Sequence, residues 1–144
     1  MQGAANYDYG MTDVTLLPIF LAGVASFVLG YLWYHPHVFG AVWMRLARIT
    51  PETVERGKRQ MPVTASLALI ANMLIAAVMN YFGIAWGVSS VVGAFELACV
   101  CWLGFVAPTM LGMVLWEHRP FTLYALNAGY WLVSFILMAI ILLL

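Results

Sequence analysis

Four long apolar stretches divide this chain, and they restrict its fold more than any other feature of the sequence. A helix needs about 20 mainly apolar residues to cross a bilayer. The stretches lie at about residues 15–34, 62–86, 88–116 and 121–144. The chain is 65% hydrophobic and 8% charged, against roughly 45–50% and about 25% in soluble domains. We therefore expect an all-α polytopic membrane protein with four transmembrane helices, a single domain over residues 1–144.

The positive charges are concentrated in two of the segments between these stretches. They are Arg45, Arg48, Arg56, Lys58, Arg59 and Arg119. With four spans, both segments lie on the same side of the membrane, and the positive-inside rule makes that side cytoplasmic. The amino-terminal tail carries only the acids Asp8 and Asp13. We therefore expect the amino and carboxy termini to lie outside.

The segment between the first two spans is expected to begin with a short amphipathic helix on the cytoplasmic surface. Its apolar face consists of Val42, Trp43, Leu46 and Ile49, which recur at helical spacing. Basic residues beside such a face are typical of a helix that lies in the membrane interface. Thr50 and Pro51 then indicate a new helix start. Gly57 and Pro62 are expected to interrupt the passage into the second span.

Small residues recur along each span, and in lipid such residues mark close helix packing. The packing positions that we infer are Ser26, Gly30, Gly104, Pro108, Gly112 and Gly129. Pro108 is also expected to kink the third span. Cys99 and Cys101 lie in an apolar run without further soft ligands, so we expect them to be small buried side chains.

Glu96 is the only acidic residue well inside an apolar stretch. An unpaired carboxylate there is strongly disfavoured, so we expect it to be protonated, hydrogen-bonded or facing a wet cavity. A tight turn near Val88 joins the second and third spans, and Asn80 and Glu96 each lie eight residues from it. A hydrogen bond between Asn80 and Glu96 is therefore expected. It is either a packing contact between helices or part of a proton, cation or ligand site.

Two further amides lie within the apolar stretches, Asn72 and Asn127. Counting from the same turn places Asn72 at the depth of Gly104, where a close approach of helices is expected. Asn127 lies nearer the cytoplasmic side. We expect both amides to make packing contacts.

Enzymatic function is not expected, because the sequence lacks nucleophile-elbow, HExxH, phosphate-loop and GxGxxG motifs. No cofactor is implied either. His35, His37 and His118 lie on one side of the membrane, but interfacial histidines are far commoner than three-histidine metal sites, so we expect no metal. A net charge of zero and the lack of a basic stripe with interleaved aromatics argue against nucleic acid as a partner.

The end of the first span carries a W-Y-x-P-x-x-F-G-x-x-W pattern. Its residues are Trp33, Tyr34, Pro36, Phe39, Gly40 and Trp43. Together with Trp102–Phe105, Glu117–Pro120 and Gly129-Tyr130, this pattern resembles the DUF1761 family of small bacterial four-helix membrane proteins, which was defined without a known function. The resemblance implies the fold and the cytoplasmic (inner) membrane of a bacterium, and it supplies no substrate or catalytic residue. Physically, the pattern is typical of a corner at the membrane edge, with Trp33 and Tyr34 as headgroup anchors.

We expect a structural or accessory subunit or a self-associating membrane component, surrounded by the lipid bilayer, as a homo-oligomer or in a larger membrane complex. The alternative is a small oligomeric channel or transporter for protons, cations or a small solute that uses Glu96. A four-helix protein with so few polar residues encloses little cavity alone. Transport would therefore require an oligomer.

Overall fold

The computed structural model describes residue 11 and residues 14–144, and this part of the chain is helical and contains no strand. In chain order the elements are α1 (Leu16–Trp33), the π-helical turn η1 (Pro36–Gly40), α2 (Ala41–Leu46), α3 (Pro51–Ala85), α4 (Val91–Cys101), the π-helical turn η2 (Trp102–Val106), α5 (Ala107–Leu115) and α6 (Phe121–Ile141). The amino-terminal tail, with Asp8 and Asp13, lies outside the described residues. Its side of the membrane stays a prediction.

Four helical segments among the described residues are long and apolar enough to cross a membrane. They are Leu16–Trp33, Pro51–Ala85, Val91–Leu115 and Phe121–Ile141. The prediction of an all-α protein with four candidate spans is therefore confirmed. The third segment runs through α4, η2 and α5, and the π-helical turn lies just before Pro108. A proline and an inserted π turn are the usual causes of a bend in a membrane helix.

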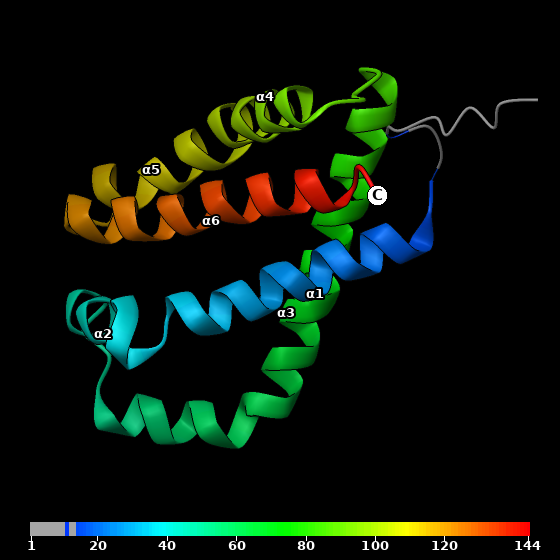
Figure 1. Cartoon of the computed structure of the whole chain (residues 1–144). Coiled ribbons are helices and arrows are strands. Elements are labelled where there is room, and N and C mark those ends of the chain that lie inside the picture. Colours follow the sequence, from blue (N-terminus) through cyan, green and yellow to red (C-terminus); the bar gives the residue numbers. More distant parts are fainter. Residues whose placement is uncertain (1–10, 12–13) are drawn as a thin grey trace, which may run out of the picture.

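The helix that contains the second span begins before the predicted span, because α3 is continuous from Pro51 to Ala85. Thr50 caps it, with the Thr53 N–H donating to the Thr50 hydroxyl oxygen at 3.3 Å. The expected interruption at Gly57 and Pro62 is therefore wrong. Pro62 lacks an N–H and bends a helix rather than ending it when the helix is held on both sides. Figure 1 shows α3 changing direction in its first third.

The four spans do not form a simple up-and-down bundle. In Figure 1, α1, α4, α5 and α6 run broadly side by side, and α3 crosses them steeply. α1 packs against α3 and α6, and α4 packs against α6. Small side chains lie between the packed helices, among them Ala22, Ala76, Ala94 and Ala98, each fully buried. Because these residues have only a methyl group, the helix backbones can approach closely.

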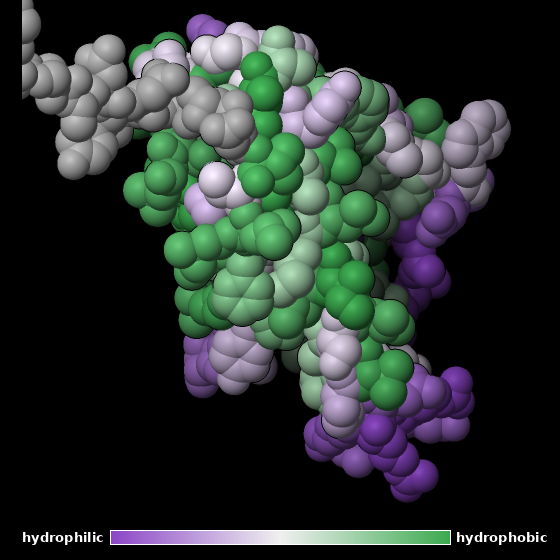
Figure 2. All heavy atoms as spheres, turned by 90° about the vertical axis from the view of Figure 1, so that its right-hand side faces the viewer, coloured by the Kyte–Doolittle hydropathy of each residue, from purple (hydrophilic) through white to green (hydrophobic). Residues whose placement is uncertain are grey.

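The outer surface is largely apolar, as expected for contact with lipid. Hydrophobic residues cover most of the face in Figure 2, and strongly hydrophilic residues gather mainly at its lower edge. The first part of α3, residues 51–60, is exposed throughout.

At the carboxy-terminal end of α3, Gly87 adopts a left-handed conformation (φ 65°) that ends the helix. There the Met11 N–H donates to the Val88 carbonyl oxygen at 3.0 Å.

Candidate functional site

A tight corner follows α1, and it is built from the W-Y-x-P-x-x-F-G-x-x-W pattern. Pro36 opens η1, where its missing N–H is not needed. The N–H of Gly40 then donates to the His35 carbonyl oxygen at 3.0 Å. Gly40 is buried, and a Cβ at this position would collide with the carbonyl oxygen of Tyr34. The corner therefore requires glycine at position 40.

Two aromatic contacts hold the corner against α1. The ring centroids of Trp33 and Phe39 lie 4.6 Å apart, and those of Tyr34 and Trp43 lie 5.5 Å apart in a nearly edge-on arrangement. The ring centroids of Tyr34 and of Tyr130 on α6 lie 5.4 Å apart. Such pairs each contribute roughly 0.5–1.5 kcal/mol beyond their buried area. The rings expected at the headgroups thus pack partly inside the chain.

Tyr34 also makes a polar contact across the corner. Its hydroxyl donates to the side-chain oxygen of Asn127 at 3.0 Å. A phenol is protonated at physiological pH, so Tyr34 is the donor in this bond. The bond leaves both N–H groups of the Asn127 amide available for another partner.

A cavity of about 480 Å³ lies between this corner and helices α5 and α6. It is lined by Tyr34, Pro36, Trp43, Met44, Met110, Asn127 and Trp131. α2 therefore directs Trp43 and Met44 toward α5 and α6 rather than only toward the membrane surface. The combination of two indoles, two thioethers, a phenol and an amide suits an amphiphilic occupant.

Two apolar hollows continue from this cavity along the outside of the molecule. One, of about 310 Å³, shares Met110 and Trp131 with the cavity. The other, of about 270 Å³, shares Ile75 and Phe135 with the first hollow and reaches Cys101. Together they form a groove beside α3 with almost no polar lining. The groove arises because α3 crosses its neighbours and leaves a gap on one side.

A buried polar knot joins α1, α3 and α6. The Ser26 hydroxyl donates to Asn72 Oδ1 at 2.7 Å, and Asn72 Nδ2 donates to the Ala68 carbonyl oxygen of its own helix at 2.8 Å. The Tyr130 hydroxyl donates to the Ser26 carbonyl oxygen at 3.3 Å. Asn72 therefore makes the packing contact expected of it. Its partner is Ser26 on α1, not the region of Gly104.

The expected hydrogen bond between Asn80 and Glu96 does not form. Asn80 is 1% exposed, and its side-chain oxygen has no hydrogen-bond partner. Glu96 lies on the exposed face of α4, near Val92, Phe95 and Val100. Counting residues from the turn assumed that the second and third spans run side by side. Because α3 crosses steeply, equal sequence distance from the turn does not bring two side chains together.

Glu96 also lies closer to the end of its span than the sequence indicated. α4 begins at Val91, after the Ser90 hydroxyl caps the Gly93 N–H at 3.2 Å. Five residues at 1.5 Å per residue place Glu96 about 7.5 Å along the helix. A helix that started at Val88, the first residue of the predicted span, would place it about 12 Å along.

The inferred packing positions divide into two groups. Gly30 lies against the Tyr130 hydroxyl, and Gly129 lies 3.8 Å from the Trp33 ring, measured from the Cβ position each glycine lacks. Gly112 contacts only Trp116 of its own segment, at 3.7 Å. Gly104 has open space around it, and Pro108 is exposed. Gly104 and Pro108 therefore pack against no other helix of the same chain, because this face of η2 and α5 points away from them, and their packing role stays a prediction.

The cysteines and histidines of the described residues do not gather into one cluster. Cys101 is buried and Cys99 is half-buried. The ring of His35 lies 5.3 Å from that of His37, and His118 lies in the α5–α6 link. The described residues contain no group of three or more His, Cys, Asp or Glu side chains placed to hold a metal ion.

The aromatic side of α6 was not predicted from the sequence. Asn127, Tyr130, Trp131 and Ser134 recur at positions i, i+3, i+4 and i+7, so they share one helix face. Tyr130 joins the polar knot, and Trp131 lines the cavity. Helical spacing alone would have identified this stripe as the inward face.

The comparisons with known proteins identify a family. The family described as "Protein of unknown function (DUF1761)" matches residues 17–143, nearly the whole chain. No curated protein and no solved structure matches this sequence. The matched range includes the corner, the polar knot and Glu96. The chain belongs to the DUF1761 family.

Proposed function

We propose that this member of the DUF1761 family is an accessory component of the bacterial inner membrane that associates with further copies of itself. The observation that supports this proposal is the outward position of Glu96 on α4, beside the exposed side chains of Val92 and Val100. Residues at i−4 and i+4 share its helix face. A carboxyl group on such a face is stabilised by polar groups of a neighbouring helix.

The partner of Glu96 is expected in another copy of the chain. The ion pairs among the described residues join Arg56 to Glu52, Lys58 to Glu55 and Arg119 to Glu117. None of them involves Glu96. Polar contacts between membrane helices contribute roughly 0.6–2 kcal/mol. Glu96 would therefore select the register of the interface, and close packing of the surrounding apolar face would supply most of the affinity.

Oxidative cross-linking in native membranes tests this interface. Val100→Cys is placed in a background with Cys99→Ala and Cys101→Ala, and Leu74→Cys in the same background is the control. Both sites are exposed on apolar helix surfaces, on α4 and α3 respectively. We expect a disulfide-linked dimer with Val100→Cys and little with Leu74→Cys. Equal cross-linking at both sites would contradict an interface on α4.

A second candidate function is a small channel or transporter for protons, cations or a small solute. The same outward position of Glu96 favours it, because an assembly through α4 would place one carboxyl group per copy along the interface. Glu96→Gln keeps the size of the side chain and its hydrogen-bonding capacity, so assembly should survive. If Glu96 carries ions, flux in reconstituted vesicles should be lost. If flux persists in Glu96→Gln, or is undetectable in the native protein, Glu96 does not carry ions and the accessory role is the one retained.

The proposed orientation places both termini outside and residues 37–61 in the cytoplasm. It is supported by the distribution of charge over the fold. α2, the start of α3 and the α5–α6 link lie at one end of the molecule, and the carboxy terminus and the α3–α4 turn lie at the other (Figure 1). The end that holds α2, the start of α3 and the α5–α6 link carries all six basic residues, so α2 would lie at the inner membrane surface. Labelling of Glu55→Cys by an impermeant reagent in intact cells would exclude this orientation.

A further inference from the structure

We propose that a second cavity, at the end of α2, binds a phosphate group presented by an anionic phospholipid headgroup. This cavity has a volume of about 480 Å³ and is lined by Leu46, Arg48, Glu117, His118, Arg119 and Pro120. It lies between the end of α2 and the link that joins α5 to α6. It shares no lining residue with the cavity between the corner and helices α5 and α6.

The charge of the lining suits a phosphate. Arg48 and Arg119 contribute two guanidinium groups, and Glu117 contributes the opposing carboxylate. The Arg119–Glu117 pair is long, at 3.8 Å, and both side chains reach solvent. Arg48 takes part in none of the ion pairs found among the described residues. Guanidinium groups bind phosphate oxygens through two parallel, charge-assisted hydrogen bonds, which are stronger than bonds between neutral groups.

The backbone indicates that these side chains have a use at this place. Arg48 (φ 56°) and His118 (φ 52°) are the only non-glycine residues in the described chain with left-handed backbone conformations. Each follows the end of a helix, α2 or α5, where glycine is the usual residue because it adopts this conformation without strain. The chain instead carries a basic or imidazole side chain at both positions, and both line the same cavity.

The position along the helices suits a lipid headgroup. The cavity adjoins the end of α5 at Leu115 and the start of α6 at Phe121, so it lies where two spans meet the interface. Trp116 (83% exposed) and Phe121 flank it, and exposed aromatic side chains favour headgroup depth. The first turn of α6 has no side-chain cap. The Leu123 N–H donates to the Pro120 carbonyl oxygen at 2.9 Å, so the first two N–H groups of α6 are the ones that add a further attraction for an anion.

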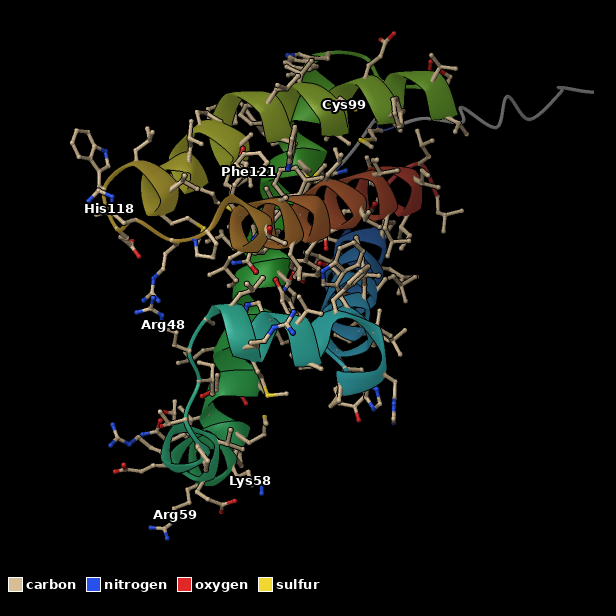
Figure 3. The ribbon with its side chains drawn as sticks, turned by 90° about the vertical axis from the view of Figure 1, so that its left-hand side faces the viewer. Arg48, Lys58, Arg59, Cys99, His118 and Phe121 are labelled. Atoms are coloured by element: carbon tan, nitrogen blue, oxygen red, sulfur yellow. The ribbon has the colours of Figure 1, made fainter. Side chains whose placement is uncertain are left out.

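Arg59 provides a matched control within the same charged end of the molecule (Figure 3). Arg48 and His118 lie along one edge, near the α5–α6 link, and Lys58 and Arg59 lie apart from them on the first part of α3. Arg59 is exposed and lines a different, mixed-charge surface with Glu52, Glu55 and Arg56. Loss of Arg59 removes the same charge from the protein without touching the proposed site.

The test measures binding of phosphatidylglycerol to the full-length, detergent-solubilised protein by native mass spectrometry, with phosphatidylcholine for comparison. A hydrogen bond to a charged group contributes about 1.5 kcal/mol or more, which is a roughly tenfold change in Kd. We expect Arg48→Gln and Arg119→Gln each to weaken phosphatidylglycerol binding about tenfold, and Arg59→Gln to leave it unchanged. Glu117→Gln should tighten binding. Equal losses in all three arginine variants, or none, would overturn the proposal.

Arg48→Gly separates binding from folding. Glycine relieves the left-handed strain at position 48, so the lipid-free protein should unfold at a higher temperature while phosphatidylglycerol binding falls. A variant that loses stability and binding together would indicate a structural role instead. Inorganic phosphate at millimolar concentration distinguishes the two sources of the phosphate group. It should not displace the lipid, and if it does, free phosphate is the ligand and the headgroup assignment is wrong.

Discussion

Two buried serines provide a matched test of the polar knot. Ser26 and Ser134 are both 0% exposed. The hydroxyl of Ser26 donates to Asn72 Oδ1 at 2.7 Å, whereas the hydroxyl of Ser134 has no hydrogen-bond partner. Replacement by alanine removes one oxygen and leaves a nearly identical shape at each site. The two variants therefore differ mainly in whether a hydrogen bond is lost.

Ser26→Ala should lower the free energy of unfolding by about 1–3 kcal/mol, because it leaves the buried Asn72 oxygen without its donor. If the Asn72 amide relaxes toward another donor, the loss falls to the roughly 0.6–2 kcal/mol of a hydrogen bond between membrane helices. Ser134→Ala removes a buried hydroxyl that gains nothing from folding. It should be neutral or stabilising by up to about 1 kcal/mol.

The measurement is reversible unfolding in mixed micelles of a mild detergent and sodium dodecyl sulfate, followed by tryptophan fluorescence. A double-mutant cycle with Ser26→Ala and Asn72→Ala isolates the bond itself and should give a coupling of about 0.6–1.7 kcal/mol. If Ser134→Ala destabilises the protein as much as Ser26→Ala, burial rather than hydrogen bonding controls both sites. A coupling near zero would show that α1 and α3 do not meet at this pair.

Three further substitutions test the corner and the helix faces, each by the same unfolding measurement. Gly40→Ala should cost about 1–3 kcal/mol because its Cβ meets the Tyr34 carbonyl oxygen, a backbone atom that cannot move freely; wild-type stability would show that the corner is looser than described. Tyr34→Phe should cost about 1 kcal/mol through loss of the bond to Asn127, with no effect expected in an Asn127→Leu background. Gly104→Leu should change the stability by less than about 0.5 kcal/mol because nothing lies near that position; a large loss would support the packing role inferred from its sequence spacing.

Local signals in the sequence were sufficient for several elements. Thr50 and Pro51 start α3 because a capping hydroxyl and a proline at the first position act within one turn of the helix. The corner at Gly40 also depends on neighbours in sequence, since Tyr34 and His35 are the residues that crowd it. The interruption expected at Pro62 failed for a related reason. A proline removes one hydrogen bond, and the other bonds of a 35-residue helix hold it together.

By itself, the sequence determined that this protein has four helices able to span a membrane, because bilayer thickness sets the length of an apolar run and no partner is needed to recognise it. The tertiary structure alone decided which side chains meet. Asn72 and Asn80 are both buried amides on α3, yet one finds Ser26 and the other leaves its oxygen unpaired, while Glu96 points outward. α3 crosses α1 near Asn72, and its steep angle to α4 keeps Asn80 and Glu96 apart, because side chains of two crossing helices meet only near the crossing point. Where two helices cross is set by packing between residues far apart in the chain, and the spacing of residues along one helix does not contain that information.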